Sequence, residues 1–502
     1  MSIKSFLGKQ LAKLIVLQTQ KWSRNPIKTQ KKVFNQLIRE GKQTAFGRDH
    51  HFSSIKNYED FKAKVPIRDY EGIKDYVERI QKGESNVLWK GTPLFFAKTS
   101  GTTSGAKHIP LTKVSLDCQI KAARNALLHY VATSGNHQFI GGKMIFLQGS
   151  PQLNKASKVP SGRLSGIVAN YVPSYLQSNR LPSFKTNCIE DWEEKVEAII
   201  DETLSEDMRL ISGIPSWVQM YFERLQKRTG KNIAELFPNF SLFVFGGVNF
   251  APYRKKFEKL IGKKVDSLEL YPASEGFIAF QDTQNEKGLL LLLDYGIFYE
   301  FIPVDEFYDE TQTRISLKDV KKGIHYVIIL NTNAGLWGYN IGDTVEFTSL
   351  NPYRIIVSGR IKHYTSAFGE HVIAKEVEQA MKLAMEAFPE VEITEFTVAP
   401  QIEPEEGLPH HEWFVEFVNP PNDISKFSNF IDESLCLQNV YYRDLIEGKV
   451  LRPLVIHSLE KNAFNDYMRL QGKLGGQNKT PRLANHRDIV NKLRKLKQGV
   501  NH

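Results

Sequence analysis

Seven consecutive residues, Thr99 to Gly105, are glycine, serine or threonine, and Lys98 and Lys107 flank them. Such a run offers hydroxyl groups and unhindered backbone N–H groups to an anion, because glycine lets the main chain turn tightly and approach a ligand closely. A nearby lysine adds a point charge for a phosphate group. The run, which follows the apolar residues 94–96, is therefore a candidate phosphate-binding loop.

The run differs from the common P-loop of nucleotide-binding proteins. That motif has four residues between its glycines and ends in Gly-Lys-Ser/Thr at the start of a helix. Here three residues separate Gly101 from Gly105, and Ala106 stands between glycine and lysine. Residues 109–111 include a proline, which favours an extended chain. A polar surface loop without a ligand is the alternative to a phosphate site.

Three later segments could complete a nucleotide site. Residues 243–247 form an apolar strand ending in two glycines, where a planar base could lie against exposed backbone. Tyr271 could stack on a purine, and Glu275, beyond a predicted bend, could hold Mg²⁺ together with phosphate oxygens. Asp343 ends a predicted turn and could accept hydrogen bonds from ribose hydroxyls. Each segment also has a simpler interpretation as a turn, a core tyrosine or a surface charge.

Length and composition indicate a globular protein of several domains. At 502 residues the chain exceeds the ~250 to 300 residues of a single core. It is 41% hydrophobic and 24% charged, which is ordinary for such a protein. Lys and Arg number 66 against 56 Asp and Glu, a net charge of +10 that suits an anionic substrate. Because the charge is spread along the chain without an arginine-rich run, we expect no nucleic-acid partner.

The cysteines and histidines predict neither disulfides nor a metal site. Cys118, Cys188 and Cys436 lie far apart and form neither a zinc pattern nor a disulfide framework, so we expect a cytoplasmic location. His410 and His411 have no neighbouring cysteine, and we interpret them as part of a solvated loop. No run approaches the ~20 apolar residues of a membrane span.

The N-terminal segment, residues 1–22, has the pattern of a basic amphipathic helix. We expect it to pack on the body of the protein, and binding to a membrane surface is the alternative. Its apolar residues at helical spacing are Phe6, Leu7, Leu11, Leu14 and Ile15.

The order of the remaining elements predicts an α/β fold followed by a smaller domain. Strands and helices alternate from residue 112 to residue 271, which is typical of a sheet with crossover helices. Thr112 should cap the helix that carries Arg124. From Phe277 on, strands follow one another and predict a β-rich subdomain. Beyond Gly359 the pattern suits an α+β domain of ~140 residues.

In this order and at these separations, the motifs resemble those of the adenylate-forming superfamily, which includes acyl-CoA synthetases and firefly luciferase. The closest likeness is to the acyl-acid amido synthetase family, whose plant members conjugate auxin and jasmonate to amino acids. The likeness runs from about residue 60 to the C-terminus. The motifs that carry it are the glycine-rich loop, Tyr271-Pro-Ala-Ser-Glu275, Tyr339-Asn-Ile-Gly-Asp343, Gly359-Arg360 and a lid loop, 472–482, that ends in Lys-x-Pro-Arg.

The resemblance implies two domains and a set of site residues. Residues 1–358 would form a large α/β adenylation domain that binds ATP and the acyl acid, and residues 359–502 a small, mobile α+β lid. Lys479 would steady the α-phosphate, Glu275 would bind Mg²⁺, and Arg124 and Trp217 would contact the acid. The implied ATP site consists of Thr99, Ser100, Gly101, Thr102, Thr103, Gly247, Val248, Tyr271, Ser274, Asp343 and Arg360.

Two positions depart from the pattern. The family usually has arginine where this chain has Asn340, and the wider superfamily often has an acid where Lys362 stands. The first departure puts one phosphate or ribose contact in question, and the second leaves the hinge residue open.

The implied activity is a ligation in two steps that uses ATP and Mg²⁺. A carboxylic acid is activated as its adenylate, and an amine, in this family an amino acid, then takes the acyl group. Two alternatives stay open at this point. One is a ligase that passes the acyl group to the thiol of coenzyme A, and the other is a non-catalytic nucleotide-binding protein.

Overall fold

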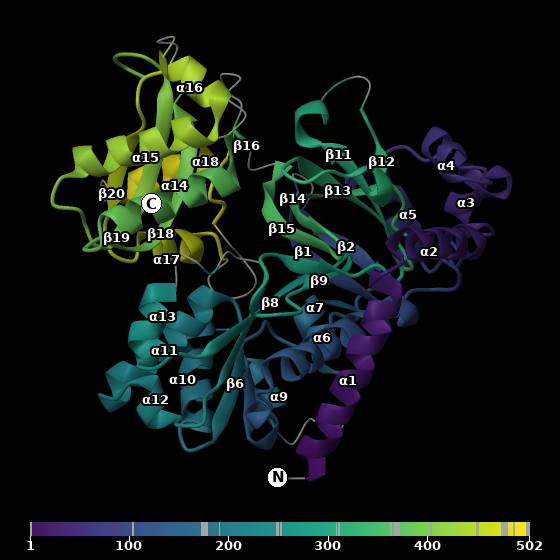
Figure 1. Ribbon diagram of the computed structural model, residues 1–502, viewed down its shortest axis with the longest axis horizontal. Coiled ribbons are helices and arrows are strands. Elements are labelled where there is room, and N and C mark those ends of the chain that lie inside the picture. Colours follow the sequence, from purple (N-terminus) through teal and green to yellow (C-terminus); the bar gives the residue numbers. More distant parts are fainter. Residues whose placement is uncertain are drawn as a thin grey trace. The chain divides into compact units, whose positions relative to one another are not determined.

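The computed structural model divides into two compact units (Figure 1). The first covers residues 1–341 and 345–356, and the second covers residues 342–344 and the other described residues from 357 on. The structure describes residues 3–102, 105–171, 179–189, 191–246, 250, 254–307, 309, 312–361, 364–365, 372–401, 404–447, 451–472, 480–484 and 487–497.

The first unit combines helices with one large and one small sheet. Its helices are α1 (Ile3–Ser23), α2 (Pro26–Gly41), α3 (Ala45–Asp49), α4 (Tyr58–Lys64), α5 (Lys74–Gln81), α6 (Lys113–Ser134), α7 (Leu164–Ala169), α9 (Phe184–Asn187), α10 (Trp192–Thr203), α11 (Pro215–Thr229), α12 (Ile233–Leu236) and α13 (Arg254–Ile261). Its strands are β1 (Phe95–Thr102), β2 (Gly105–Leu111), β3 (Lys143–Phe146), β4 (Ser161–Gly162), β5 (Arg180–Leu181), β6 (Met208–Ser212), β7 (Leu242–Gly246), β8 (Asp266–Ala273), β9 (Gly276–Phe280), β10 (Leu289–Leu291), β11 (Ile297–Pro303), β12 (Ile315–Ser316), β13 (His325–Thr332) and most of β14 (Tyr339–Leu350) and β15 (Tyr353–Arg360). Residues 342–344 of β14 and 357–360 of β15 are assigned to the second unit.

The large sheet has two parts with different strand directions. Among the described residues its order is β12-β11-β13-β14-β15-β10-β9-β8-β7-β6-β3-β5. Strands β5, β3, β6, β7 and β8 pair in parallel, whereas β8, β9, β10 and β15 pair antiparallel. The predicted α/β sheet and the β-rich subdomain that follows it are therefore confirmed, and both belong to one sheet.

Helices cover both faces of the parallel part because its strands are apolar on both sides. Ile211 of β6 lies in a buried cluster with residues of α10, α11 and α13. Its neighbour Leu210 points the other way, into a cluster with residues of α1 and α6. In Figure 1 the two sets of helices lie on opposite sides of β6. This arrangement leaves the carboxyl ends of the parallel strands as the place where loops can form a site.

Helix α6 links the small sheet to the large one. The small sheet has the order β2-β1-β4, and α6 begins directly after β2. Thr112 is its N-cap, as predicted, because the hydroxyl accepts a hydrogen bond of 3.1 Å from the backbone N–H of Ser115. The start of α6 is therefore fixed next to the glycine-rich segment.

Helix α1 packs on α6, as the N-terminal pattern predicted, but the expected apolar face is buried only in part, and the burial of Phe6 and Leu7 lies outside the described residues. Ala12 and Ile15 are buried against α6, and Thr19 Oγ1 lies 2.9 Å from Nε2 of His129. Leu11 and Leu14, which we expected on the buried face, are exposed. None of the described helices is both long and apolar enough to span a membrane.

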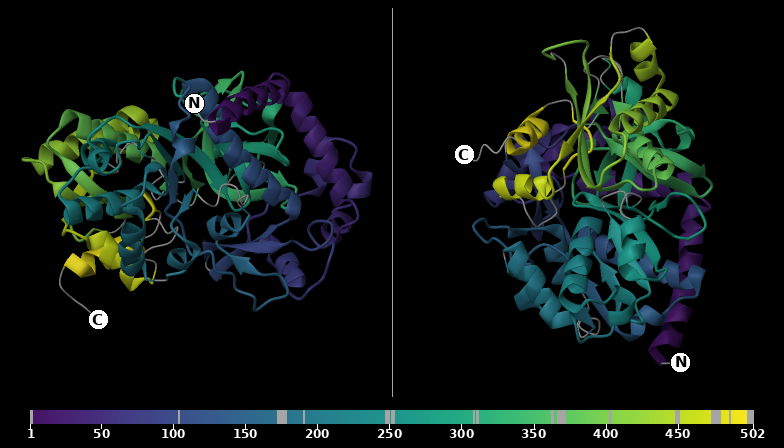
Figure 2. Two further views of the ribbon diagram at one scale, coloured as in Figure 1. Left: turned by 90° about the horizontal axis from the view of Figure 1, so that it is seen from below. Right: turned by 90° about the vertical axis from the view of Figure 1, so that its left-hand side faces the viewer.

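The second unit is an α+β domain. Its elements are β16 (Tyr364–Thr365), β17 (Val372–Ile373), α14 (Ala374–Ala387), β18 (Glu392–Gln401), β19 (His410–Asn419), α15 (Ile424–Gln438), α16 (Val440–Glu447), β20 (Val455–Leu459), α17 (Ala463–Leu470) and α18 (Asp488–Lys497). The central sheet has the order β18-β19-β20, with β19 antiparallel to β18 and parallel to β20. One face packs on α14 and α15, and the other packs on α17 and α18, the yellow helices in Figure 2.

His410 and His411 are buried on β19, so the prediction of a solvated loop is wrong. Both histidines pair with β18, whereas β20 pairs with β19 only from Glu412 on. Because side chains alternate along a strand, His410 and Glu412 share the face that packs on α17 and α18. No group of acidic, histidine or cysteine side chains among the described residues could hold a metal ion.

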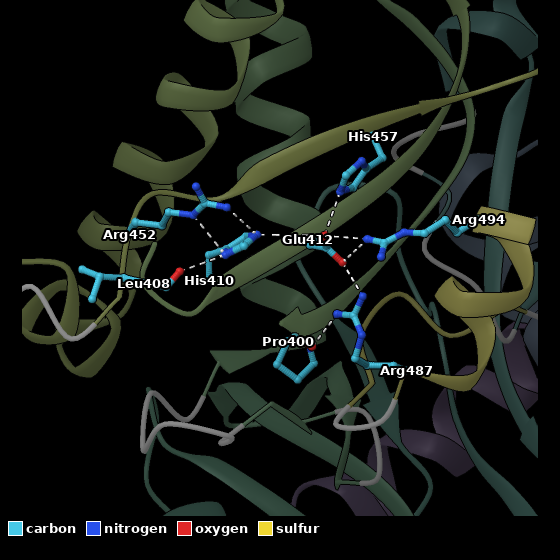
Figure 3. Close-up of polar contacts among 8 residues, drawn as sticks. All are labelled: Pro400, Leu408, His410, Glu412, Arg452, His457, Arg487 and Arg494. Atoms are coloured by element: carbon cyan, nitrogen blue, oxygen red, sulfur yellow. Dashed lines mark hydrogen bonds and ion pairs between the residues drawn. The ribbon is translucent and has the colours of Figure 1, made fainter. Parts of the chain in front are cut away.

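Glu412 is the buried centre of an ionic cluster on that face (Figure 3). Its carboxylate accepts hydrogen bonds of 2.9 Å from His457 and 2.7 Å from Arg494, and a further one from Arg487. At the edge of the cluster, Nε of Arg452 donates a hydrogen bond of 3.1 Å to Nδ1 of His410. The contacts tie the C-terminal helix α18 to the sheet of the second unit.

Candidate active site

The glycine-rich segment lies on two strands of a hairpin rather than in a long loop. Thr99 pairs with Lys107 and Thr102 with Gly105, with an irregularity in the register between them. Threonine suits an extended chain, which explains why the run continues β1. Thr103 and the side chains of Ser100 and Thr102 lie outside the described residues.

Tyr271, Ser274 and Glu275 belong to the β8–β9 hairpin, so the predicted bend is present. Ala273 pairs with Gly276, which places Ser274 and Glu275 in the two-residue turn. Tyr271 is 6% exposed and lies in the same apolar cluster as Phe96 and Ala97 of β1. The hairpin that carries Glu275 and the strand that leads to Thr99 are therefore packed on one core.

The end of β7 lies beside Tyr271 in the parallel sheet. Gly246 pairs with Leu270, the residue before Tyr271. A Cβ atom at Gly246 would approach the carbonyl oxygen of Leu270 to 2.5 Å, so only glycine fits there. The next residues, Gly247 and Val248, lie outside the described residues.

Asp343 lies on a strand, and the turn predicted there is wrong. Residues 339–350 form β14. Within this strand Gly342 has a φ of +85°, a backbone conformation that favours glycine. Asp343 is 9% exposed and belongs to the second unit. The backbone N–H of Asn340 donates 2.7 Å to the carbonyl oxygen of Arg68. Arg360 is the last residue of β15, and its side chain is not among those described. Lys362 lies outside the described residues.

Arg124 and Trp217 come from helices on opposite faces of the sheet. Arg124 is exposed on α6, and its guanidinium donates to Oδ1 of Asn125 at 3.2 Å. Trp217, in the first turn of α11, is 6% exposed and lies in the apolar cluster of that face. A pocket shared by the two side chains can form only beyond the carboxyl ends of the strands.

Lys479 lies outside the described residues, but the chain that follows it is anchored within the second unit. Arg482 donates 3.1 Å to the carbonyl oxygen of Phe396 and lies 4.6 Å from the centre of its ring. The carbonyl oxygen of Arg482 accepts from Val398, and Val398 in turn accepts from Ala484. The Lys-x-Pro-Arg segment thus ends on β18.

Glu275 suits the ligand set of a magnesium nucleotide. Mg²⁺ is usually held by one or two carboxylates together with phosphate oxygens and water. Glu275 is partly exposed at the tip of a turn, where a phosphate-bound ion could reach it. A closed site made only of protein ligands is not found among the described side chains.

Glu269 is a titratable group near this hairpin that sequence reasoning missed. It lies on β8 two residues before Tyr271 and therefore on the same face of the sheet. Burial raises the pKa of its carboxyl to about 7, and the charge of Arg254 partly opposes the rise. A charged residue between Leu268 and Leu270 in an apolar strand was the signal that could have revealed it.

Comparison with known proteins gives the family. The GH3 family N-terminal domain matches residues 16–185 and 164–265, the central domain matches residues 290–360, and the C-terminal domain matches residues 375–488. The chain belongs to the GH3 family. These matches follow one another in order and cover most of this GH3 chain.

Two solved structures and one sequence relative show how far the similarity extends. A jasmonoyl–L-amino acid synthetase from rice, Oryza sativa subsp. japonica, is 22% identical over 92% of this chain and 93% of its own length. A GH3.15 acyl acid amido synthetase superposes with a TM-score of 0.80 at 17% identity, covering 96% of each chain. A 2-hydroxyisobutyryl-CoA ligase in the postadenylation state superposes with a TM-score of 0.62 at 12% identity, covering 95% of this chain and 93% of the other. The fold is thus that of adenylate-forming ligases, as the motifs implied.

Proposed function

We propose that this GH3 protein is an ATP-dependent ligase that joins a carboxylic acid to an amine, an amino acid, through an amide bond. The observation that carries the proposal is the match of all three GH3 domains in order along the chain. The rice relative, which by its name joins jasmonate to amino acids, supports the same class of acceptor.

The proposed reaction has two steps. A carboxylate oxygen attacks the α-phosphorus of ATP, and the bond from this phosphorus to the oxygen that bridges to the β-phosphorus breaks. The products are acyl-adenylate and pyrophosphate. The neutral amine then attacks the acyl carbon, the bond to the adenylate oxygen breaks, and amide and AMP form with loss of the proton from the amine. Both steps depend mainly on positioning and on neutralising phosphate charge.

We assign the following roles to residues of this chain. The β1–β2 hairpin, residues 99–103, holds the phosphates, and Tyr271 with the end of β7 holds the adenine. Asp343 holds the ribose, and Lys479 stabilises the charge that develops at the α-phosphate. Glu275 would hold Mg²⁺, which supplies positive charge to the phosphate oxygens when bound.

We further propose that residues 359–502 act as a mobile lid on an adenylation domain formed by residues 1–358. An acyl-adenylate is hydrolysed easily, so a domain that excludes water during the reaction would protect it. The reaction takes place in the cytoplasm in this proposal, because Cys118, Cys188 and Cys436 are free thiols, which suits a reducing compartment.

Product analysis tests the class of acceptor. The protein is incubated with ATP, Mg²⁺ and an acid that supports pyrophosphate release, and then with pooled amino acids or with coenzyme A. We expect mass spectrometry to detect an amide with one or more amino acids and no thioester. A thioester without any amide would assign the chain to the acid–thiol ligases, and tight ATP binding without pyrophosphate release for any acid would make it non-catalytic.

A further inference from the structure

The excess of positive charge lies in one segment of the chain. Residues 1–39 contain nine Lys and Arg residues and no Asp or Glu. When these nine are taken from the totals of 66 and 56, the rest of the chain keeps 57 Lys and Arg against 56 Asp and Glu. Lys and Arg are spread along the chain, but their excess over acidic residues is not. Helices α1 and α2 are therefore the basic region of the protein.

Helix α1 is apolar on two opposite faces. Ala12 and Ile15 are buried in the cluster that α1 shares with α6. Leu11, Leu14 and Leu17 are 44%, 57% and 55% exposed. Two residues further along a helix is about 200° around its axis, so Leu14 points away from Ala12 and Leu17 away from Ile15. Packing on α6 explains one apolar face of α1 and leaves the other unexplained.

The three exposed leucines form a stripe. Single exposed apolar side chains are common on soluble proteins and need no explanation. Leu11, Leu14 and Leu17 instead follow one another at a spacing of three residues, which makes them neighbours on the helix surface. In the views of Figures 1 and 2, α1 lies along the outer edge of the first unit. A continuous apolar stripe at such an edge indicates an interaction surface.

Lysines alternate with these leucines on the same side of α1. Lys13 and Lys21 are exposed, and each lies four residues from Leu17. Residues four apart share one side of a helix. We call Leu11, Lys13, Leu14, Leu17 and Lys21 the α1 outer face. A long lysine stem lets the ammonium group extend past an apolar layer into a polar one, so this face suits a partner that is both apolar and anionic.

Helix α2 adds positive charge next to α1. Two residues separate the helices, and one of them, Arg24, is exposed. Lys28, Lys31 and Lys32 are also exposed, whereas the other side of α2 is buried. Electrostatic attraction extends over about 10 Å in ordinary buffer. These cations therefore strengthen the attraction to an anionic surface without having to lie in one plane with the α1 outer face.

We propose that the α1 outer face docks on an anionic phospholipid membrane. The leucines enter the boundary between headgroups and acyl chains, and the lysines stay at the level of the anionic headgroups. The protein lies on the membrane surface, since none of the described helices is long and apolar enough to cross it. The inference does not depend on the proposed ligase activity.

Other partners satisfy only part of the α1 outer face. A symmetric dimer formed through this face would bring two copies of the same lysines together, and like charges repel. Nucleic acid would pair with the lysines through its phosphates but would leave the leucine stripe without an apolar partner. A membrane with anionic lipids provides both the negative charge and the apolar layer.

Sedimentation with sucrose-loaded vesicles tests the proposal. The full-length protein is mixed with vesicles of phosphatidylcholine alone, or of phosphatidylcholine with phosphatidylserine. We expect wild type to bind the anionic vesicles at least about tenfold more tightly than the neutral ones. This preference should shrink in about 1 M salt, where the Debye length is only about 3 Å.

Variants of the α1 outer face separate its two contributions. Leu14→Gln should weaken binding to the anionic vesicles by about tenfold, because the burial of one leucine side chain is lost. The double variant Lys13→Gln/Lys21→Gln should weaken it by about 25-fold, which is about fivefold for each charge. Glutamine has nearly the helix propensity of leucine and lysine. The melting temperature should therefore stay at the wild-type value in both variants.

Matched controls place the effect on α1. Leu437→Gln, at a leucine of α15 that is 86% exposed, should bind vesicles like wild type. The double variant Lys227→Gln/Lys461→Gln, at exposed lysines of α11 and of the segment after β20, should also bind like wild type. Equal losses in the control and α1 variants would mean that no particular face binds, which contradicts the proposal.

Two further outcomes would overturn the inference. One is a wild-type protein that binds neither kind of vesicle or binds both equally. The other comes from sedimentation velocity without lipid. A wild-type dimer that becomes a monomer in Leu14→Gln would make the α1 outer face an interface between two copies of the chain. We expect wild type and Leu14→Gln to have the same sedimentation coefficient.

Discussion

Nε2 of Gln119 on α6 donates a hydrogen bond of 2.8 Å to the backbone carbonyl oxygen of Ala273, the last residue of β8. The two residues are 154 positions apart in sequence. The bond joins the helix that begins after the glycine-rich hairpin to the turn that carries Ser274 and Glu275. The turn that carries Ser274 and Glu275 is therefore held directly on the helix that follows the glycine-rich hairpin.

Replacing Gln119 with leucine should weaken this link. The variant leaves the carbonyl oxygen of Ala273 without its partner, which should lower the free energy of unfolding by about 1 to 3 kcal/mol. KM for ATP should rise because the β8–β9 turn is no longer held on α6. Urea unfolding and exchange kinetics measure the two effects, and Gln10→Leu, at an exposed position on α1, is the control. Unchanged stability and unchanged KM would show that the bond has no such role.

The sequence predicted most elements of the fold because their signals are local. Helix α6 begins at a threonine cap and shows apolar residues at helical spacing. The parallel strands β6 and β7 are short apolar runs between helices. The strands β1 and β14 were harder to predict, because their Gly, Ser, Thr and Asp residues favour turns locally. Pairing with distant strands decides those segments, and no short window contains that information.

Lys479 should be essential for forming the adenylate. Lys479→Ala removes the charge that we assign to the α-phosphate, and we expect pyrophosphate exchange to fall by on the order of 100-fold. Binding of ATP should change less, because the lysine acts when charge builds up during the reaction. Lys461→Ala, at an exposed lysine of the same unit, is the control. Exchange at the wild-type rate in Lys479→Ala would remove this residue from the mechanism.

Glu275 should set the requirement for Mg²⁺. In Glu275→Gln one charged ligand is lost, so the Mg²⁺ concentration for half-maximal exchange should rise by about tenfold, equivalent to about 1.4 kcal/mol of binding. Titration of exchange activity with Mg²⁺ measures the shift. Glu286→Gln, at an exposed site after β9, should behave as wild type. If both variants show the same dependence on Mg²⁺, Glu275 does not hold the metal.

Glu412 should stabilise the second unit. Glu412→Gln removes the charge that pairs with Arg487 and Arg494 and accepts from His457, and weakening these hydrogen bonds to half-buried groups should cost about 1 to 3 kcal/mol. Limited proteolysis should then cleave near α18 sooner. Glu433→Gln, on the exposed side of α15, is the matched control. Equal protease resistance of the two variants would contradict this role.

The same cluster predicts the effect of acid. Burial alone would raise the pKa of Glu412, but hydrogen bonds from His457 and Arg487 lower it to about 2, below the ordinary value of 4.5. A carboxyl with a lowered folded-state pKa stabilises fully above its unfolded pKa and loses that contribution as the pH falls through the folded value. Wild type should therefore lose stability between about pH 4.5 and 2 more steeply than Glu412→Gln.

The candidate site was predictable only in part. Motifs revealed the segments around Tyr271 and Asp343 because their residues are contiguous. Glu269 belongs to no motif, and only the folded structure shows that burial raises the pKa of its carboxyl to about 7. The burial of His411 was missed because its cover comes from segments distant in the sequence: it pairs with Pro400 of β18, and its ring lies 5.2 Å from that of Tyr442.

Acid-dependent ATP–pyrophosphate exchange tests the central claim most directly, because it detects the adenylate without knowledge of the amine. Purified protein is mixed with ATP, Mg²⁺, labelled pyrophosphate and a library of carboxylic acids. The account predicts that label enters ATP only when a suitable acid is present, and that Lys479→Ala suppresses this incorporation. Label that enters ATP equally without any acid, or with none of the library, would contradict an acyl-activating enzyme.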